Sequence, residues 1–383
     1  MDSSPSTATA VTRRSPTQDH LRSIAEAFTT GGTFISGIPH GTGHINDTFA
    51  IQCQQPQGIT RFILQRINQR VFRDVPALMD NIRRVTEHVA KKIPLLPASH
   101  RHRRTLTIVP TAGGEVYHQE ATGDYWRCYV FIERASTYDV LQHPKQAREA
   151  AYAFGHFQGL LADLGGERLH ETIPNFHHTR KRFNTLLQSA EQAPASRQAL
   201  AQEELAFARD RERWVDLLLN LQTSGAIPER ITHNDTKLNN VMLDDKTGEG
   251  VCVIDLDTVM PGLSLYDFGD MVRSATNSAA EDEVDLTRVH MQMPVFAALL
   301  DGYLSSAKSF LNVAEKEHLV VAAQILTFEV GIRFLADYLD GDIYFKTHRP
   351  HHNLQRARNQ FALVRSMEAQ QGEMQRHLGA LIS

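Results

Sequence analysis

The sequence predicts an α+β protein with a small, sheet-rich N-terminal lobe and a larger, mainly helical C-terminal lobe. The chain has 383 residues, which is too long for one ordinary domain and suits two. Short apolar runs with the alternation typical of strands are concentrated in roughly the first 130 residues. Apolar residues at helical spacing dominate the rest, apart from one island of predicted strand around residues 231–257. We therefore expect the two lobes to cover residues 18–132 and 133–383.

The N-terminal lobe is expected to follow a disordered tail, residues 1–17, which is small, polar and contains proline. The first helix starts near Asp19 and stops before Gly31 and Gly32. The other elements expected in this lobe are strands at Thr33–Gly37, Thr48–Cys53, Arg61–Ile67, Leu106–Pro110 and Trp126–Ile132 and a helix at Val75–Lys91. The C-terminal lobe is expected to be helical from Lys145–Leu164, through residues 190–222, to the end of the chain.

Composition and charge exclude several classes of protein. The chain is 42% hydrophobic and 22% charged, so it can bury a sizeable core, and its net charge of −4 offers no global attraction for nucleic acid or an anionic membrane. It has no run of about 18 apolar residues and no apolar N-terminal stretch. Its three cysteines, Cys53, Cys128 and Cys252, form no CxxC pair and fit a reducing cytosol. We expect a cytoplasmic monomer or weak homodimer whose partners are small molecules, not nucleic acid or membranes.

Residues 231–270 hold the pattern that points to chemistry. A loop contains Asp235, Lys237 and Asn240, and a strand, VCVID, then ends in the carboxylates of Asp255 and Asp257. Because side chains alternate along a strand, these last two can face the same way if the chain stays extended. An asparagine oxygen and a carboxylate suit Mg²⁺ held together with substrate phosphates, and another aspartate can take a proton from an attacking hydroxyl. The pattern therefore indicates phosphoryl transfer.

The same stretch resembles a known superfamily. HNDTKLNN at residues 233–240 matches the HxDxxxxN catalytic loop of protein-kinase-like folds, and Ile254-Asp255 matches their metal-binding aspartate. These motifs most resemble those of the aminoglycoside phosphotransferase group of small-molecule kinases. Within that group, HNDTKLNNVM, VIDLDTVMPG and the N-terminal GTGHINDTF resemble N-acetylhexosamine 1-kinases, which phosphorylate the anomeric hydroxyl of GlcNAc or GalNAc. The resemblance implies a two-lobed, protein-kinase-like fold that uses ATP and Mg²⁺.

Carried over residue by residue, the resemblance assigns roles within the loop and the strand that follows it. Asp235 is expected to be the catalytic base and to contact the acceptor, and Lys237 is expected to lie near the γ-phosphate. Asn240 and Asp255 are expected to bind Mg²⁺. Asp257 is either a second metal contact or a strand-end cap.

Two neighbouring residues have alternatives of their own. We expect His233 to fix the loop by hydrogen bonds rather than to carry a proton. Asp267 begins the tripeptide DFG, whose aspartate binds Mg²⁺ in protein kinases, but Asp255 already occupies that place. The resemblance implies that Asp267 instead braces the catalytic loop, and a metal-binding role is the alternative.

Two segments are candidates for nucleotide binding. Gly41 and Gly43 lie in a hairpin loop whose exposed backbone N–H groups could cover phosphates, although such glycines usually just permit a turn. The segment YVFIERAS at 129–136 is typical of an interlobe hinge, where Phe131 and Glu133 would bind adenine, although its aromatic residues could be plain core.

The expected phosphate-binding lysine is missing. The strand RFILQRI should supply it, but Gln65 stands there with Arg66 beside it. Alternation places these two side chains on opposite faces, so only one of them can point toward a nucleotide. Either Gln65 contacts phosphate through its amide or the role of the lysine is dispensed with.

Three residues are candidates for holding the sugar. His44 lies in the glycine loop, with an exposed histidine as the alternative. Arg333 lies in an apolar helix four residues from both Glu329 and Asp337, so an ion pair on the helix surface is its alternative. Tyr344 could stack on the sugar ring or simply pack.

The sequence thus predicts an ATP- and Mg²⁺-dependent kinase for the anomeric hydroxyl of an N-acetylhexosamine. A kinase for another small metabolite, such as choline, homoserine or an aminoglycoside, is the main alternative. Aminoglycosides are polycations and need an acidic cleft. The segment KTHRPHHNLQRARNQ near the C-terminus is instead rich in His, Arg and Asn, which suits a neutral polyhydroxylated ligand better. A nucleotide-binding pseudokinase is the third possibility, supported by the missing lysine.

Overall fold

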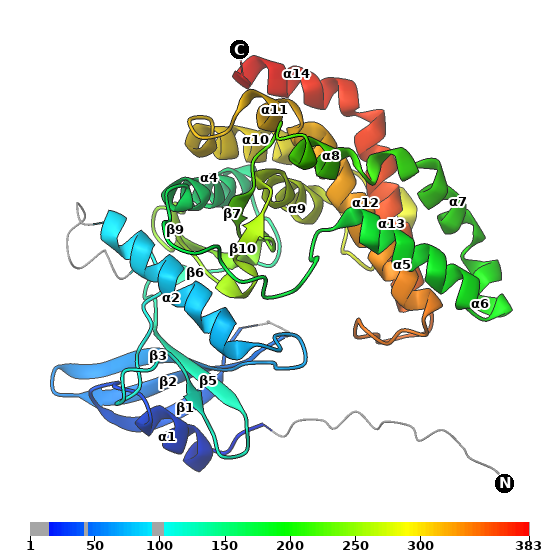
Figure 1. Ribbon diagram of the computed structural model, residues 1–383. Helices are drawn as coiled ribbons and strands as arrows, with labels where there is room; N and C mark the ends of the chain where they lie inside the picture. The colour runs from blue at the N-terminus through cyan, green and yellow to red at the C-terminus, as the bar shows by residue number, and fades with distance from the viewer. Residues whose placement is uncertain (1–14, 42–44, 94–102, 383) are drawn as a thin grey trace, which may run out of the picture. The chain divides into compact units, whose positions relative to one another are not determined.

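The computed structural model describes residues 15–41, 45–93 and 103–382 (Figure 1). By its internal contacts the chain divides into two compact units. Unit 1 is formed by the residues up to Val71 together with Thr107–Phe131, and unit 2 by Phe72–Leu106 and everything from Ile132 onward. The helix that follows residue 74 therefore groups with unit 2 and not with the N-terminal sheet.

Unit 1 consists of one helix and a five-stranded antiparallel sheet with the strand order β1-β2-β3-β5-β4. Its elements are α1 (Gln18–Glu26), β1 (Thr33–Pro39), β2 (Asp47–Gln55), β3 (Gly58–Arg66), β4 (His118–Gln119) and β5 (Tyr125–Val130). Leu64 of β3 and Trp126 of β5 face the same side, where they pack with Leu21 and Ile24 of α1 in the core of this unit. One face of the sheet is thus buried against α1, and the other face is free to carry polar residues.

The ends of the first elements have local causes. α1 begins at Gln18 because the hydroxyl of Thr17 accepts a hydrogen bond from the backbone N–H of His20 at 3.2 Å, an N-cap. Of the tail predicted over residues 1–17, residues 1–14 lie outside the described residues. The predicted strand Leu106–Pro110 is wrong as a strand, because only Ile108 makes a bridge, to Tyr129 of β5. Pro110 cannot donate to a ladder, which ends the pairing there.

Strand alternation decides where the two candidate residues at the end of β3 point. Arg66 lies on the core face, where it pairs with Asp47 at 2.7 Å and stands over the ring of Trp126. Gln65 lies on the opposite face and is directly opposite Arg127 of β5. The expectation that alternation places the two side chains on opposite faces is confirmed, and Gln65 is the residue on the face away from the core.

Unit 2 is mainly helical and contains two small sheets with the orders β6-β8-β9 and β10-β7. Its elements are α2 (Val75–Lys92), β6 (Ala135–Ser136), α4 (Pro144–Leu161), α5 (Thr179–Gln192), α6 (Ala195–Leu200), α7 (Gln202–Asp210), α8 (Leu217–Thr223), β7 (Arg230–Thr232), β8 (Val241–Asp244), β9 (Gly250–Val253), β10 (Met260–Gly262), α9 (Ser264–Thr276), α10 (Met293–Ala307), α11 (Val313–Glu317), α12 (Leu319–Leu339), α13 (His352–Ala369) and α14 (Gln371–Ile382). The predicted helical stretch 190–222 is broken into short pieces rather than continuous.

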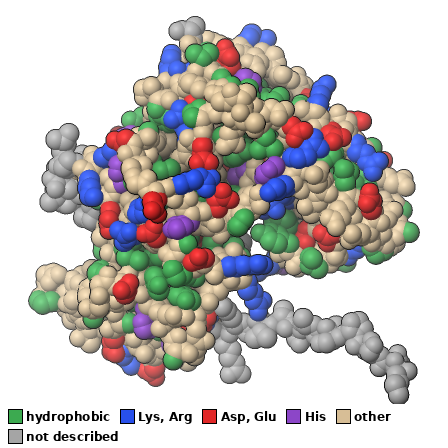
Figure 2. All heavy atoms as spheres, in the orientation of Figure 1, with side chains coloured by type: hydrophobic (Ala, Val, Ile, Leu, Met, Phe, Trp, Pro, Cys, Tyr) green, Lys and Arg blue, Asp and Glu red, His purple; other side chains and the backbone are tan. Residues whose placement is uncertain are grey.

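Helix α12 is the central element of unit 2 and contacts α5, α9 and α13 (Figure 1). It is the one helix among the described residues that is long and apolar enough to cross a membrane, but 89% of its most apolar window is buried inside the structure. A core helix of this kind explains the apolar composition of residues 319–339. On the face drawn in Figure 2, acidic and basic side chains are interspersed, as expected for 40 basic and 44 acidic residues.

Strand β7 delivers the chain to the predicted catalytic loop, and a buried ion pair holds its first residue. The guanidinium of Arg230 donates to both carboxylate oxygens of Glu315, at 2.6 and 2.7 Å. Glu315 also accepts a bond from Ser264, the first residue of α9, at 2.7 Å. One carboxylate therefore ties the start of β7 to the start of α9, the two elements that flank the loop.

Candidate active site

The loop between β7 and β8 has an unusual backbone that a single carboxylate supports. Asn234 adopts the left-handed conformation with φ of 65°, which is uncommon for a residue other than glycine. The carboxylate of Asp267, in the first turn of α9, accepts the backbone N–H groups of His233 at 2.9 Å and Asn234 at 2.7 Å. It also accepts the side chain of Gln158 at 2.5 Å. Asp267 is thus the brace that the resemblance implied, and its oxygens point at the loop.

A second carboxylate on the same face of α9 continues this support. Asp270 accepts the backbone N–H of Thr236 at 2.8 Å and pairs with Arg273 at 2.8 Å. Asp267, Asp270 and Arg273 follow one another at intervals of three residues, so they lie along one side of the helix. The sequence analysis did not single out Asp270 or Arg273, although their three-residue spacing from Asp267 could have indicated them.

The opposite side of the loop is packed so tightly that it requires a glycine. The hydroxyl of Thr232 donates to the side-chain oxygen of Asn234 at 3.0 Å, and the Asn234 amide donates to the carbonyl of Thr258 at 2.9 Å. A Cβ at Gly262 of β10 would lie 2.3 Å from the Thr232 hydroxyl and 2.9 Å from the Asn234 oxygen. Because such contacts are closer than atoms allow, only glycine fits there.

The loop gathers three of the predicted functional side chains. The amine of Lys237 lies 2.9 Å from one oxygen of Asp235 and 3.2 Å from the other. The side-chain nitrogen of Asn240 donates to the backbone carbonyl of Asp235 at 2.7 Å and to its carboxylate at 3.2 Å. Both bonds of Asn240 use its nitrogen, which turns its amide oxygen away from Asp235. The loop therefore brings a carboxylate, a cation and a side-chain amide together in one place.

The charge of Lys237 sets the protonation state of Asp235. Burial raises the pKa of Asp235, but the charge and the hydrogen bond of Lys237 outweigh burial and hold that pKa below its usual range. The charge of Asp235 in turn raises the pKa of Lys237. The side chain of Lys237 is 47% exposed, so solvent screens part of this attraction. Asp235 is therefore a carboxylate near neutral pH and is able to accept a proton.

His233 is fully engaged in holding the loop. One ring nitrogen, Nε2, lies 2.9 Å from the carbonyl of Ile254 and must donate to it, because a carbonyl only accepts. The other, Nδ1, then accepts the backbone N–H of Asp235 at 3.4 Å. The ring packs edge-on against Phe154 and Phe157. Both ring nitrogens thus have hydrogen-bond partners within the loop and the residue after β9, in line with the structural role expected of His233.

The two carboxylates after β9 are not aligned as an extended strand would align them. β9 ends at Val253, Asp255 adopts a left-handed φ of 57°, and residues 256–258 form a short 3-10 turn. Asp255 is exposed, whereas Asp257 is buried with its backbone carbonyl bonded to Thr172. The premise that the chain stays extended here is wrong, because the turn redirects it at Asp255.

The residues proposed to hold Mg²⁺ offer oxygen donors of the right kind. The carboxylate of the exposed Asp255 and the amide oxygen of Asn240, whose nitrogen is bonded to Asp235, are hard donors of the kind that suits Mg²⁺ together with phosphates. Within the described residues, no group of three or more His, Cys, Asp or Glu side chains could hold a metal ion unaided.

The candidates for nucleotide binding in unit 1 are placed as follows. Gly41 has a left-handed φ of 77°, which a hairpin loop requires, whereas Gly43 and the proposed sugar ligand His44 lie outside the described residues. Gln65 accepts a bond from Nε of Arg127 and donates to the hydroxyl of Thr48, both at 2.9 Å. Its amide is therefore held between two neighbouring strands.

The predicted hinge coincides with the boundary between the two units. Phe131 closes unit 1, where its backbone N–H bonds to Arg61 and its ring lies 3.8 Å beneath the Arg61 guanidinium. Glu133 is the second residue of the following segment, which belongs to unit 2, and its backbone carbonyl accepts a bond from Arg103 at 3.0 Å. That carbonyl is thus already bonded within the chain.

Arg333 does not form the ion pairs that its helix offers. Glu329, one turn before it, bonds instead to His177 at 2.8 Å and Thr179 at 2.6 Å. Asp337, one turn after it, accepts backbone N–H groups. The Arg333 guanidinium lies between two aromatic rings, 5.4 Å from Phe176 and 5.7 Å from Phe345.

The turn that carries Tyr344 is anchored through its backbone. The carboxylate of Asp337 accepts the N–H groups of Ile343, Tyr344 and Phe345 at 3.0, 2.7 and 3.0 Å, and the Asn353 amide at 2.8 Å. The side chain of Tyr344 remains 64% exposed, so it does not serve as core packing. Arg333 therefore forms one cluster with three aromatic residues, Phe176, Phe345 and Tyr344, which we call the arginine–aromatic cluster.

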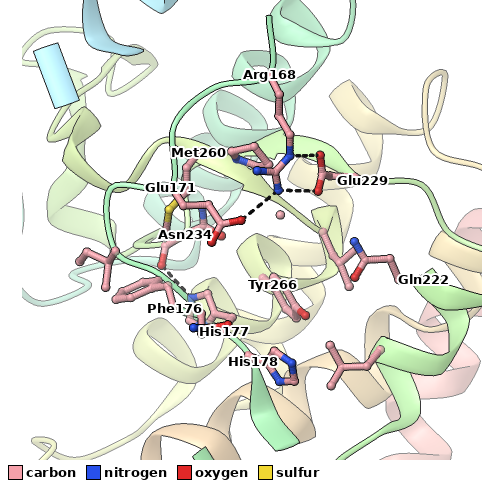
Figure 3. Close-up of a pocket in the computed structure, with 16 residues that line it drawn as sticks. Arg168, Glu171, Phe176, His177, His178, Gln222, Glu229, Asn234, Met260 and Tyr266 are labelled. Carbon is pink, nitrogen blue, oxygen red and sulfur yellow. Dashed lines mark hydrogen bonds and ion pairs between the residues drawn. The ribbon is translucent and has the colours of Figure 1, made fainter. Parts of the chain in front are cut away.

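A buried histidine that the sequence reasoning missed links this cluster to the loop. His177 contacts Glu329 of α12 through one ring nitrogen. The other ring nitrogen lies 3.0 Å from the backbone carbonyl of Asn234, a contact that Figure 3 shows. Burial lowers the pKa of His177, but the bond to Glu329 outweighs burial and raises it overall. No local pattern could reveal this contact, because His177 and Glu329 lie 152 residues apart in the sequence.

His177 also borders a pocket of about 150 Å³ (Figure 3). The pocket is lined on one side by Phe176 and Asn234, and on the other by Arg168, which pairs with Glu229 at 2.8 Å. Phe176 therefore belongs both to this pocket and to the arginine–aromatic cluster.

The fold and the loop together define a two-lobed, protein-kinase-like phosphotransferase. The chain belongs to the phosphotransferase enzyme family, which matches residues 36–300. This membership confirms the prediction of phosphoryl-transfer chemistry and of the broad family.

Solved structures support the same fold. A microcompartment-associated aminopropanol kinase is similar over 89% of this chain and 93% of its own, with a TM-score of 0.56 and 15% identity. An aminoglycoside phosphotransferase from Alicyclobacillus acidocaldarius covers 94% of both chains, with a TM-score of 0.57 and 13% identity. An amicoumacin kinase, solved with AMP-PNP and Ca²⁺, covers 92% of this chain and 93% of its own, with a TM-score of 0.55 and 12% identity. At identities this low, the similarity shows the fold alone. It confirms the predicted α+β, two-lobed fold class.

Replacing the brace should separate stability from chemistry. In Asp267→Asn, the amide can accept through one oxygen only, so at least one backbone N–H of the loop loses its partner. We expect the free energy of unfolding to fall by about 2–3 kcal/mol, together with activity. Asp235→Asn is the matched control, because it should cost ~10²–10⁴-fold in kcat with little change in Tm. Thermal unfolding and turnover of both variants check this, and an Asp235→Asn enzyme retaining over about a tenth of its activity would contradict the role of base.

The Lys237 charge should set the acid limb of the pH–rate profile. Because that charge holds the pKa of Asp235 below its usual range, the wild-type base stays deprotonated until the pH falls well into the acid range. In Lys237→Met, burial remains and raises this pKa, so kcat/KM should begin to fall at a higher pH. The exposed Lys246→Met is the control and should leave the limb in place. Superimposable acid limbs in all three enzymes would show that Lys237 does not tune the base.

Proposed function

We propose that this protein is an ATP- and Mg²⁺-dependent kinase that phosphorylates the anomeric hydroxyl of an N-acetylhexosamine such as GlcNAc or GalNAc. In this proposal Asp235 takes the proton of that hydroxyl, and Lys237 faces the transferred phosphoryl group. Asn240 and Asp255 hold Mg²⁺. Asp257 is either a second contact to the metal or a cap at the end of the strand. The motifs of the loop, the family membership and the kinase-like fold support this reading.

One observation above the others favours an uncharged sugar as the acceptor. Arg333 is released from both ion pairs of its helix and held between Phe176 and Phe345. A guanidinium fixed in this way presents several N–H donors, and aromatic rings suit the apolar faces of a sugar. Tyr344 adds an exposed ring beside them. A polyhydroxylated, uncharged ligand uses all of these features.

The reaction does not require a strong base. The anomeric hydroxyl is more acidic than the other hydroxyls of the ring, so a carboxylate can accept its proton. Asp235 takes that proton as the hydroxyl oxygen bonds to the γ-phosphorus and the bond to ADP breaks. When bound, Mg²⁺ would neutralise charge on the phosphates. The low pKa of Asp235 keeps it ready for this step across neutral pH.

The role of the missing lysine falls to Arg127 in this proposal. Arg127 lies directly opposite Gln65, on the same face of the sheet, and the two side chains are bonded at 2.9 Å. Its guanidinium also stands 5.4 Å from the ring centre of Tyr129. A cation on the neighbouring strand thus stands within one side-chain length of the position where protein kinases place their lysine. Gln65 would position this arginine for the phosphates, and Gly41 and Phe131 would border the nucleotide.

The remaining expectations belong to the same proposal. A cytoplasmic enzyme fits three buried free cysteines. A monomer or weak homodimer that binds no nucleic acid fits the net charge of −4 and the mixed charges on the face drawn in Figure 2.

A comparison of acceptors tests the proposal directly. ATP-dependent phosphorylation is measured with free GlcNAc, GalNAc, choline, aminopropanol and an aminoglycoside. We expect turnover with the N-acetylhexosamines and a product with the acid lability of a glycosyl phosphate. The methyl glycosides, in which the anomeric oxygen is blocked, should bind but not react. A phosphorylated methyl glycoside would refute the anomeric assignment, and turnover of choline or aminopropanol alone would refute the sugar.

Arg333→Ala should weaken the binding of the acceptor selectively. We expect KM for the sugar to rise ~10- to 150-fold, the cost of losing hydrogen bonds from a charged group, while KM for ATP changes little. Arg83→Ala is the matched control, because Arg83 does form the helix-surface ion pair, with Glu87 at 3.3 Å. An Arg333→Ala enzyme with normal sugar KM and only a lower Tm would return this residue to a structural role.

A further inference from the structure

A second arginine adjoins the arginine–aromatic cluster and was not among the residues singled out in the sequence. Arg182 of α5 donates to the backbone carbonyl of Phe176, from Nη2 at 3.0 Å and Nε at 3.3 Å. Arg333 of α12 lies over the ring of the same phenylalanine. Two guanidinium groups from different helices therefore approach one residue, and both side chains are only partly buried.

The two arginines are close enough to affect each other. Burial lowers the pKa of Arg182 and the charge of Arg333 lowers it further, while the charge of the buried Glu329 opposes this fall. Two like charges in one place are costly unless a ligand or a carboxylate compensates them. An ion pair between either arginine and a carboxylate is not found among the residues that the structure describes.

The carboxylates around the cluster are already committed to other groups. Glu329 is bonded to His177 and Thr179, and Asp337 to three backbone N–H groups and an amide. Asp235 is paired with Lys237. Asp270 is paired with Arg273. An ammonium group needs a carboxylate of its own, and the described part of the cluster offers none that is not engaged.

We propose that Arg182 is a specificity-determining residue which, with Arg333, makes the acceptor site reject alcohols that carry an ammonium group. The accepted ligands are alcohols whose polar groups are uncharged oxygens, to which a guanidinium can donate. This inference rests on the proposed function, because it takes the acceptor to bind beside Arg333. It goes further by naming the property, net charge, on which acceptors are sorted.

Three acceptors that differ only at carbon 2 of the same hexose isolate that property. They carry an acetamido group, a hydroxyl group and a protonated amine, and kcat/KM is measured for each at a pH that keeps the amine charged. The hydroxyl sugar shows what the loss of the acetyl group costs without any charge. We expect the wild-type enzyme to discriminate against the amine by at least ~10-fold relative to the hydroxyl sugar, because like charges repel in a partly desolvated site.

Variants of Arg182 should change the ratio of kcat/KM between the hydroxyl sugar and the amino sugar without changing KM for ATP. Arg182→Gln should lower the discrimination several-fold, and Arg182→Glu should lower it further, while KM for ATP stays the same. Lys181→Glu is the matched control, because it makes the same change of charge one residue away on an exposed side chain. High salt should weaken the discrimination in the wild-type enzyme.

The outcomes separate this inference from the proposed function. If the sugars react and the ratio is the same in the wild-type, Arg182→Gln and Lys181→Glu enzymes, the inference is wrong and the function stands. If the wild-type enzyme prefers an ammonium alcohol to every sugar, both are wrong. Should Arg182→Glu unfold, Arg182→Gln and the salt dependence still decide the question.

Discussion

The loop between β7 and β8 depends on a carboxylate that lies outside it, that of Asp267. A left-handed residue other than glycine costs of order 1–3 kcal/mol, so Asn234 keeps its conformation only if its surroundings impose it. Asp267 does so by accepting the N–H groups of residues 233 and 234 at once. Burial raises the pKa of Asp267, and the hydrogen bonds oppose that rise. Its place in the first turn of α9 also sets it near the positive end of the helix dipole, which stabilises its charge. The positions of Asp235 and Asn240 follow from this one arrangement.

Local spacing in the sequence was enough to predict the fold class and the components of the loop. Asp235, Lys237 and Asn240 lie within six residues, so their proximity follows from the chain itself. Strand alternation likewise separated Gln65 from Arg66 correctly. The same reasoning failed after β9, because it assumed an extended chain and a left-handed Asp255 turns the backbone there. The pattern of residue types shows which groups are present, but not a reversal of φ at one residue.

Contacts between distant segments could not be predicted at all. The pairing of His177 with Glu329 joins residues from α12 and from the segment before α5, and neither position is marked by spacing or composition. The same holds for Arg182 and Phe176, whose contact with Arg333 depends on how α5 packs against α12. A helix-surface ion pair was the reasonable expectation for Arg333 from its neighbours alone. Tertiary packing removed both partners by giving each of them a better-satisfied site.

The turn after α12 is held in a way that leaves its side chains replaceable. From residues 343–345, the carboxylate of Asp337 accepts hydrogen bonds only from backbone N–H groups, and every amino acid except proline has such a group. These three hydrogen bonds can therefore form with any residue except proline at 343 and 344, whereas Phe345 also packs against Phe334 and Arg333. Side chains at 343 and 344 can be exchanged one at a time while the scaffold and the catalytic loop stay as they are. A fold that separates the anchoring of a segment from the identity of its residues can acquire new ligands by few mutations, and this segment is where such a change would start.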